Sequence, residues 1–174
     1  MADVADEVAR WMGILSSGML IGEEAERSAL RAHHVLGRER LLELRAWFDA
    51  QPPEAVADAK VAIVEAIMSI ALADGGLEDR ERALADHMIE LAELDEVTQV
   101  ALRDRISAPP TLDAVVPRIA HPSLRELVLV MAWQMAKVDG RVEQEEHGAY
   151  GVLADRLGVT PVRSQELRAL FRGE

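Results

Sequence analysis

The sequence contains no cysteine, and only 3% of its 174 residues are aromatic. The absence of cysteine excludes disulfides, thiolate metal sites, thiol redox chemistry and cysteine nucleophiles. Few aromatic side chains are available to stack on bases, and a net charge of −12 argues against binding a phosphate backbone, which requires a basic face. We therefore expect no nucleic acid among the partners of this protein.

Apolar runs long enough to span a bilayer are also missing. The first residues, MADVADEVARW, carry three acids and lack the basic-then-apolar pattern of a secretory signal. We therefore expect a cytoplasmic protein without a membrane span. The P-loop, the dinucleotide glycine fingerprint, the Gly-x-Ser-x-Gly elbow and the His-Glu-x-x-His motif are absent as well, so we expect no enzymatic activity.

The sequence is rich in helical periodicity. Apolar residues recur at three- and four-residue spacing almost throughout, and alternating β-branched runs are absent. This pattern predicts an all-α fold, a helical bundle of about seven to nine helices. Apart from two long apolar segments, we expect helices near 3–18, 23–34, 38–49, 78–91, 96–106, 143–157 and 162–171, and a short one between 106 and 122.

The two long apolar segments both end at an Asp-Gly pair. The first begins at Pro53, a favourable residue for the first helical position, and reaches the pair at 74–75. The second begins near Ser123, which we predict as its N-cap, with Glu126 completing a capping box, and reaches the pair at 139–140. Glycine at such a position can adopt the left-handed conformation that ends a helix.

The order helix, Asp-Gly, helix, turn, helix occurs twice, with the Asp-Gly pairs 65 residues apart. This repetition indicates an internal duplication that gives two similar helical clusters within one domain, residues 1–174. The expected parts of this domain are N-terminal helices at 1–50, a first repeat unit at 54–106, a connector at 111–122 and a second repeat unit at 123–172.

Each Asp-Gly pair belongs to an acidic motif, ALADGGLEDRE at 71–81 and AKVDGRVEQEE at 136–146. In each motif two glutamates three residues apart share one side of a helix's first turn, and an aspartate precedes them across a tight turn. Converging carboxylates suit a divalent cation such as Ca²⁺, Mg²⁺, Mn²⁺ or Zn²⁺. The predicted metal ligands are Asp74, Glu78, Glu81, Asp139, Glu143 and Glu146.

Two other interpretations of the motifs bear on this prediction. The spacing matches the second half of an EF-hand loop, but the ligand positions of the first half fall on Ile70, Leu72, Met135 and Lys137, which excludes an EF-hand. A purely structural role stays open, because acids in the first turn of a helix are favoured by the helix dipole and Asp-Gly commonly ends a helix. A duplication copies a structural turn as readily as a set of ligands.

The doubled motif, placed each time after a long apolar helix in an acidic helical chain, resembles that of the tellurite-resistance TerB-like family. The resemblance covers residues 54–172 best. It implies a fold of two helical clusters that share long central helices, in proteins of bacterial stress-response systems that include tellurite resistance and phage defence. It also implies divalent metal binding, with the aspartate and final glutamate of the family pattern falling on Asp74 and Glu81 and on Asp139 and Glu146.

From the motifs and the resemblance we expect a non-enzymatic binding or adaptor domain of a stress-response system, with a protein partner. Two alternatives remain: a protein-interaction scaffold whose acidic turns are structural, and a metal-dependent hydrolase in which adjacent cations activate water. The C-terminal helix is locally basic, with Arg163, Arg168 and Arg172 against Glu166, and would suit an acidic partner. We interpret the stripe of Met131, Trp133, Met135 and Met68 as core filler.

Overall fold

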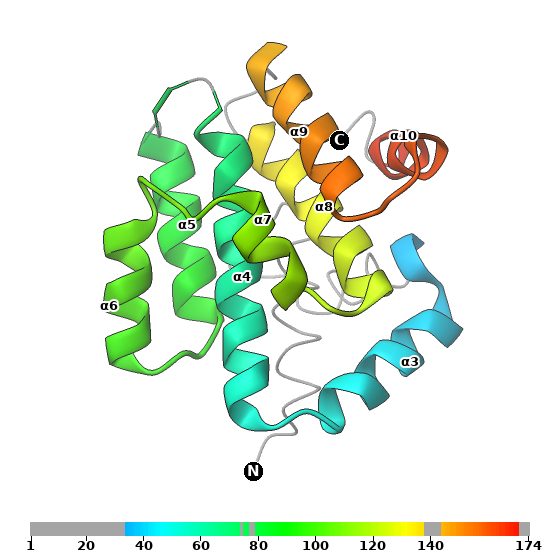
Figure 1. Ribbon diagram of the computed structural model, residues 1–174, viewed down its shortest axis with the longest axis horizontal. Coiled ribbons are helices and arrows are strands. Elements are labelled where there is room, and N and C mark those ends of the chain that lie inside the picture. The colour runs from blue at the N-terminus through cyan, green and yellow to red at the C-terminus, as the bar shows by residue number, and fades with distance from the viewer. Residues whose placement is uncertain (1–33, 74, 77–78, 138–143, 171–174) are drawn as a thin grey trace.

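The computed structural model describes residues 34–73, 75–76, 79–137 and 144–170. Within these ranges every regular element is a helix, which confirms the all-α prediction (Figure 1). The predicted helix at 3–18 and almost all of that at 23–34 lie outside them. The elements are α3 (Arg38–Asp49), α4 (Pro53–Ala71), α5 (Asp79–Leu91), α6 (Glu96–Arg105), α7 (Leu112–Val115), the 3-10 helix η1 (Val116–Arg118), α8 (Pro122–Ala136), α9 (Gln144–Arg156) and α10 (Pro161–Ala169).

Helix α4 is the centre of the bundle. It is apolar on most sides, packs chiefly against α8, and also contacts α5, α7, η1 and α9. Lys60, on α4, is only 5% exposed, and its ammonium group donates a hydrogen bond to the carbonyl of Ala92 at 2.6 Å, which compensates for its burial. None of the described helices is long and apolar enough to cross a membrane. The methionines predicted as core filler are buried: Met68, Met131 and Met135.

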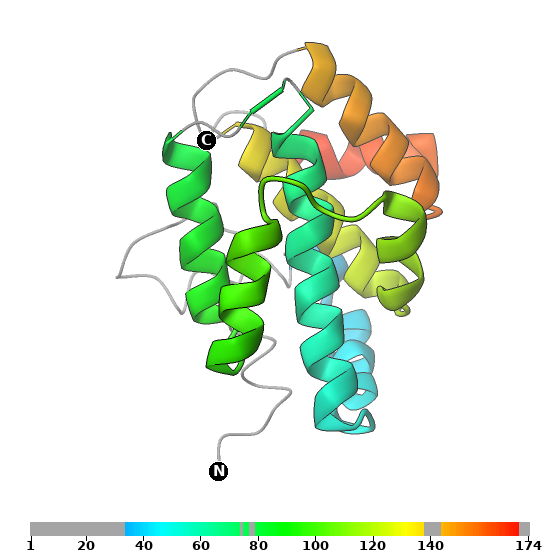
Figure 2. The ribbon, with the colours of Figure 1, turned by 60° about the vertical axis from the view of Figure 1, so that its left-hand side comes forward.

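The order of α4, α5 and α6 is repeated by α8, α9 and α10. Asp79 and Gln144, which begin α5 and α9, are 65 residues apart, and Glu96 and Pro161, which begin α6 and α10, have the same separation. Helices α4 and α8 run in the same direction in both views. Their C-terminal ends, and the first turns of α5 and α9, therefore lie at one end of the molecule (Figures 1 and 2).

The starts of the last helices agree with the sequence pattern. The hydroxyl of Thr160 accepts a hydrogen bond from the backbone N–H of Arg163 at 3.3 Å, so Thr160 is the N-cap of α10. In the first unit the carboxylate of Asp95 accepts a hydrogen bond from the backbone N–H of Thr98 at 2.9 Å. Both helices therefore begin with a side chain that satisfies an otherwise unpaired backbone donor.

Two predicted helix ends are wrong. The N-cap of α8 is His121, whose Nδ1 accepts a hydrogen bond from the backbone N–H of Ser123 at 3.2 Å. Pro122 is the first helical residue, which proline favours because it has no N–H to satisfy, and the cap therefore lies two residues before Ser123. Helix α4 ends at Ala71, before the Asp-Gly pair, and Gly75 lies in the following turn with a φ of 110°.

Candidate metal-binding site

The predicted ligands fall at the two junctions between a core helix and the helix that follows it, α4 to α5 and α8 to α9. Glu81 and Glu146 are described by the structure. The other four predicted ligands lie outside the described residues: Asp74, Glu78, Asp139 and Glu143. Because the ends of these helices share one end of the bundle, the topology brings the two motifs to the same side of the molecule (Figure 2).

Glu81 and Glu146 have equivalent positions and equivalent burial. Each is the third residue of its helix, Glu81 in α5 and Glu146 in α9. They are only 6% and 4% exposed, respectively. A carboxylate buried to this degree must be compensated by hydrogen bonds, a positive charge or a metal ion. The last acid of each motif is therefore turned into the protein.

Other acids of the same first turns behave differently. Asp79, the first residue of α5, and Glu145, the second of α9, are both exposed to solvent. Acids at these positions interact favourably with the positive end of the helix dipole without being buried. The burial of Glu81 and Glu146 is thus a property of their positions and not of every acid in the motifs.

Within the described residues, no group of three or more histidine, aspartate or glutamate side chains is arranged to hold a metal ion. Of each predicted cluster, only one carboxylate belongs to the described residues, Glu81 in the first and Glu146 in the second. The nearby histidines are not brought toward the glutamates by any described contact: His147 is exposed and packs against Trp133, with ring centroids 5.1 Å apart, and His87 lies 3.9 Å from Glu90.

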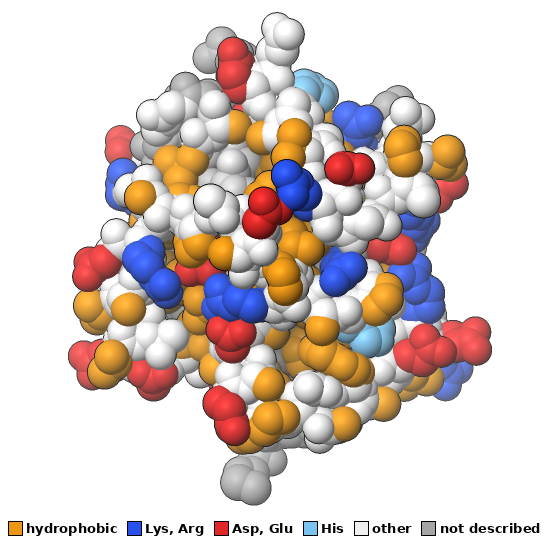
Figure 3. Space-filling view, viewed as in Figure 1, with side chains coloured by type: hydrophobic (Ala, Val, Ile, Leu, Met, Phe, Trp, Pro, Cys, Tyr) orange, Lys and Arg blue, Asp and Glu red, His pale blue; other side chains and the backbone are white. Residues whose placement is uncertain are grey.

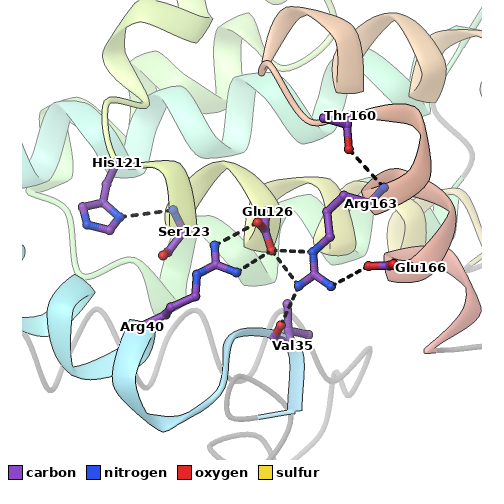
Figure 4. A network of polar contacts seen from close by, with 8 residues as sticks. All are labelled: Val35, Arg40, His121, Ser123, Glu126, Thr160, Arg163 and Glu166. Carbon is purple, nitrogen blue, oxygen red and sulfur yellow. Dashed lines mark hydrogen bonds and ion pairs between the residues drawn. The ribbon is translucent and has the colours of Figure 1, made fainter.

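Sequence reasoning missed a network of charges around Glu126 (Figure 4). Glu126 was predicted to complete a capping box, but its carboxylate instead accepts hydrogen bonds from two arginines. Arg40 of α3 donates at 2.8 and 3.1 Å, and Arg163 of α10 donates at 2.8 and 3.0 Å. Arg163 also donates to the carbonyl of Val35 at 2.9 Å and to Glu166 at 3.0 Å. These hydrogen bonds link α3 and α10 to α8.

A second missed network holds the connector against α4. Glu65 is 2% exposed, and its Oε2 lies 2.7 Å from Arg118 of η1, while its Oε1 lies 3.4 Å from Arg105 without hydrogen-bond geometry. Arg118 also pairs with Asp58 at 2.6 Å. The hydrogen bonds that Arg118 donates to the carboxylate of Asp58 outweigh desolvation, so the pKa of Arg118 lies above its usual value. A lone acid in the apolar run VAIVEAIMSIA was the signal in the sequence, because buried glutamates are almost always paired.

Acidic and basic side chains are interspersed on the face shown in Figure 3, with blue groups beside red ones. The excess of acids is not gathered there into one large patch. The networks around Glu126 and Glu65 are consistent with this mixed surface, because each places arginines beside carboxylates.

One family model matches this chain. It is described as "Protein of unknown function (DUF533)" and matches residues 8–170. The match covers the first repeat unit and the second as far as residue 170, and it extends further toward the N-terminus than the resemblance over 54–172. No curated protein and no solved structure matches the chain.

Proposed function

We propose that this chain, which belongs to the DUF533 family, a TerB-like family, is a non-enzymatic binding or adaptor domain that holds divalent cations through its two Asp-Gly turns. The observation that carries the proposal is the equivalence of Glu81 and Glu146. Both are buried, at the same helical position, at the same end of the bundle. A role in a stress-response system of the tellurite-resistance type, with a protein partner, completes the proposal.

The chemistry of the donor set favours a hard cation. Aspartate and glutamate supply only oxygen, and backbone carbonyls and water complete the coordination that Ca²⁺, Mg²⁺ and Mn²⁺ prefer. Zn²⁺ is bound most often by cysteine and histidine, and the chain has no cysteine. We therefore expect Ca²⁺, Mg²⁺ or Mn²⁺ to bind more tightly than Zn²⁺.

Calorimetric titration of chelator-stripped protein with each of the four cations tests this proposal. The test variant is Asp74→Asn with Asp139→Asn. The matched control is Asp79→Asn with Glu145→Gln, which removes the same charge from exposed acids of the same two helix starts. We expect saturable binding by the unmodified protein and by the control, and affinity weaker by about tenfold or more in the test variant, the effect of losing a charged ligand. Equal affinity in both double variants would eliminate the Asp-Gly turns as ligands.

A second candidate function is a protein scaffold with structural acidic turns. The observation that favours it is that the third helical position is where a glutamate of a capping box reaches back to the N-cap backbone. On this alternative Glu81 and Glu146 stabilise their helices without a cation. The two candidates differ in thermal unfolding: a bound cation raises the unfolding temperature with concentration, whereas a structural turn leaves it unchanged.

A further inference from the structure

A cavity of about 260 Å³ lies between α9 and α10. Its lining residues all lie outside the two acidic motifs, although α9 also carries the end of the second motif. Its walls include His147, Gly151 and Asp155 from α9, and Ser164 and Arg168 from α10. The cavity is smaller than the pockets that take drug-sized ligands, which are about 300 to 1,000 Å³. It therefore has room for a small group only.

Arg168 is the most unusual residue of this cavity. Its guanidinium carbon lies 5.4 Å from the ring centroid of Trp133 and 5.2 Å from that of Tyr150, so two aromatic faces hold it. Its Nε is buried and has no hydrogen-bond partner, and no carboxylate in the described part of the chain pairs with it. Arg163 on the same helix is, by contrast, fully engaged with Glu126 and Glu166.

The space in the cavity depends on Gly151. Helix α9 contains two glycines, Gly148 and Gly151, although glycine within a helix destabilises it relative to alanine. A Cβ atom added at either position would meet no other atom within 4 Å. Of these two glycines Gly151 lines the cavity and Gly148 does not, so a long side chain at 151 is the one expected to occupy part of it.

We propose that this cavity, whose wall also includes Ala154, Val159 and Pro161, binds a carboxylate group carried by a short apolar body, with Arg168 as its anchor. The planar fork of arginine matches both oxygens of a carboxylate, and the cation–π contacts with Trp133 and Tyr150 limit the movement of this fork. The hydroxyl of Tyr150 already donates to the carbonyl of Ser164 at 3.3 Å. Asp155 in the wall repels a doubly charged ligand, which favours a monoanionic carboxylate over phosphate.

The carboxylate can come from a free small molecule or from the C-terminus of a protein, and two arms of one experiment separate these sources. In the first arm the full chain is titrated with benzoate and hexanoate, and binding is followed by the NMR signals of the protein's backbone N–H groups. Benzamide and hexanamide, which have the same shape without the charge, are the control ligands. In the second arm a short peptide that ends in a leucine carboxylate is compared with its C-terminal amide. Each arm uses the unmodified protein, Arg168→Gln, Gly151→Leu, and Gly148→Leu as the matched control.

We expect saturable shifts around the cavity with carboxylates but not with amides. Arg168→Gln should weaken binding about tenfold or more, as expected for loss of a charge-assisted pair. Gly151→Leu should abolish binding, and Gly148→Leu should leave it unchanged. Binding in the second arm alone would assign the carboxylate to a protein terminus.

The proposal is overturned if neither arm shows binding, if amides bind as tightly as carboxylates, or if the two glycine variants behave alike. Should Arg168→Gln fail to fold, Gly151→Leu decides the matter, because it fills the cavity and leaves the arginine in place. Phosphate that competes as strongly as the carboxylates would overturn the preference for a monoanion.

Discussion

Glu126 joins parts of the chain that are far apart in the sequence, since Arg40 and Arg163 both donate to its carboxylate. Burial by itself would raise the pKa of Glu126, but the hydrogen bonds from the two arginines outweigh burial and hold this pKa below its ordinary value of 4.5. A carboxyl whose pKa is lower in the folded than in the unfolded protein stabilises the fold above the unfolded pKa. That stability is lost as the pH falls through the folded value.

We therefore predict that Glu126→Gln lowers the free energy of unfolding by about 1 to 3 kcal/mol at neutral pH, because two partly buried arginines lose a charged acceptor. The difference from the unmodified protein should shrink as the pH falls through the folded pKa of Glu126, which lies below 4.5, because the carboxyl is then itself protonated. Urea unfolding across this range measures both effects.

Glu166→Gln is the control for this prediction. Glu166 is 56% exposed and, among the described residues, pairs with Arg163 alone, three residues earlier on the same helix, at 3.0 Å. An exposed pair of this kind contributes about 0.5 kcal/mol or less. Equal losses in the two variants would show that burial of Glu126 adds nothing to the interaction.

The start of α8 depends on the protonation of one histidine. The Nδ1 of His121 can accept the hydrogen bond from Ser123 only while that nitrogen is unprotonated. Burial is the largest effect on its pKa and lowers it, Glu43 raises it, and Arg40 lowers it, so the pKa lies below the ordinary value of 6.5. The unfolded protein therefore takes up this proton at a higher pH than the folded protein does.

It follows that the cap contributes stability above about pH 6.5, and that this stability is lost as the pH falls through the folded pKa. We predict that His121→Asn, which caps at any pH, removes this part of the pH dependence, and that His121→Ala loses about 1 kcal/mol at neutral pH. Thermal unfolding of the three proteins between about pH 5 and pH 8 measures both. An unchanged pH dependence in the asparagine variant would contradict the role given to Nδ1.

The helices themselves were largely predictable from the sequence, because apolar spacing and start signals act within a few residues of each other. Pro53 is the first residue of α4 and Thr160 is the N-cap of α10, as their residue types indicate. The start of α8 was assigned to the wrong residue, because Ser123 and Glu126 fit a capping box locally. Histidine is not among the usual capping residues, so nothing in the sequence pointed to His121.

Over the whole molecule, the pairing of charges could not be predicted. Arg40 and Glu126 are 86 residues apart, and Arg118 and Glu65 are 53 apart, so both pairs depend on how the helices pack. The duplication, by contrast, is visible in the sequence as a repeat of 65 residues. The repeat makes Glu81 and Glu146 equivalent positions, and both are buried in the structure. The cavity beside Arg168 could not be foreseen either, because it is formed by two helices and by the absence of a side chain at Gly151.

The most direct test of the cation proposal is to locate a paramagnetic ion. Isotope-labelled protein, stripped of metal, is titrated with substoichiometric Mn²⁺, and the broadening of each backbone amide is measured by NMR. The account predicts that the last turns of α4 and α8 and the first turns of α5 and α9 broaden first, while α3 and α6 stay sharp. Broadening that is absent, or that centres on another part of the surface, would contradict it.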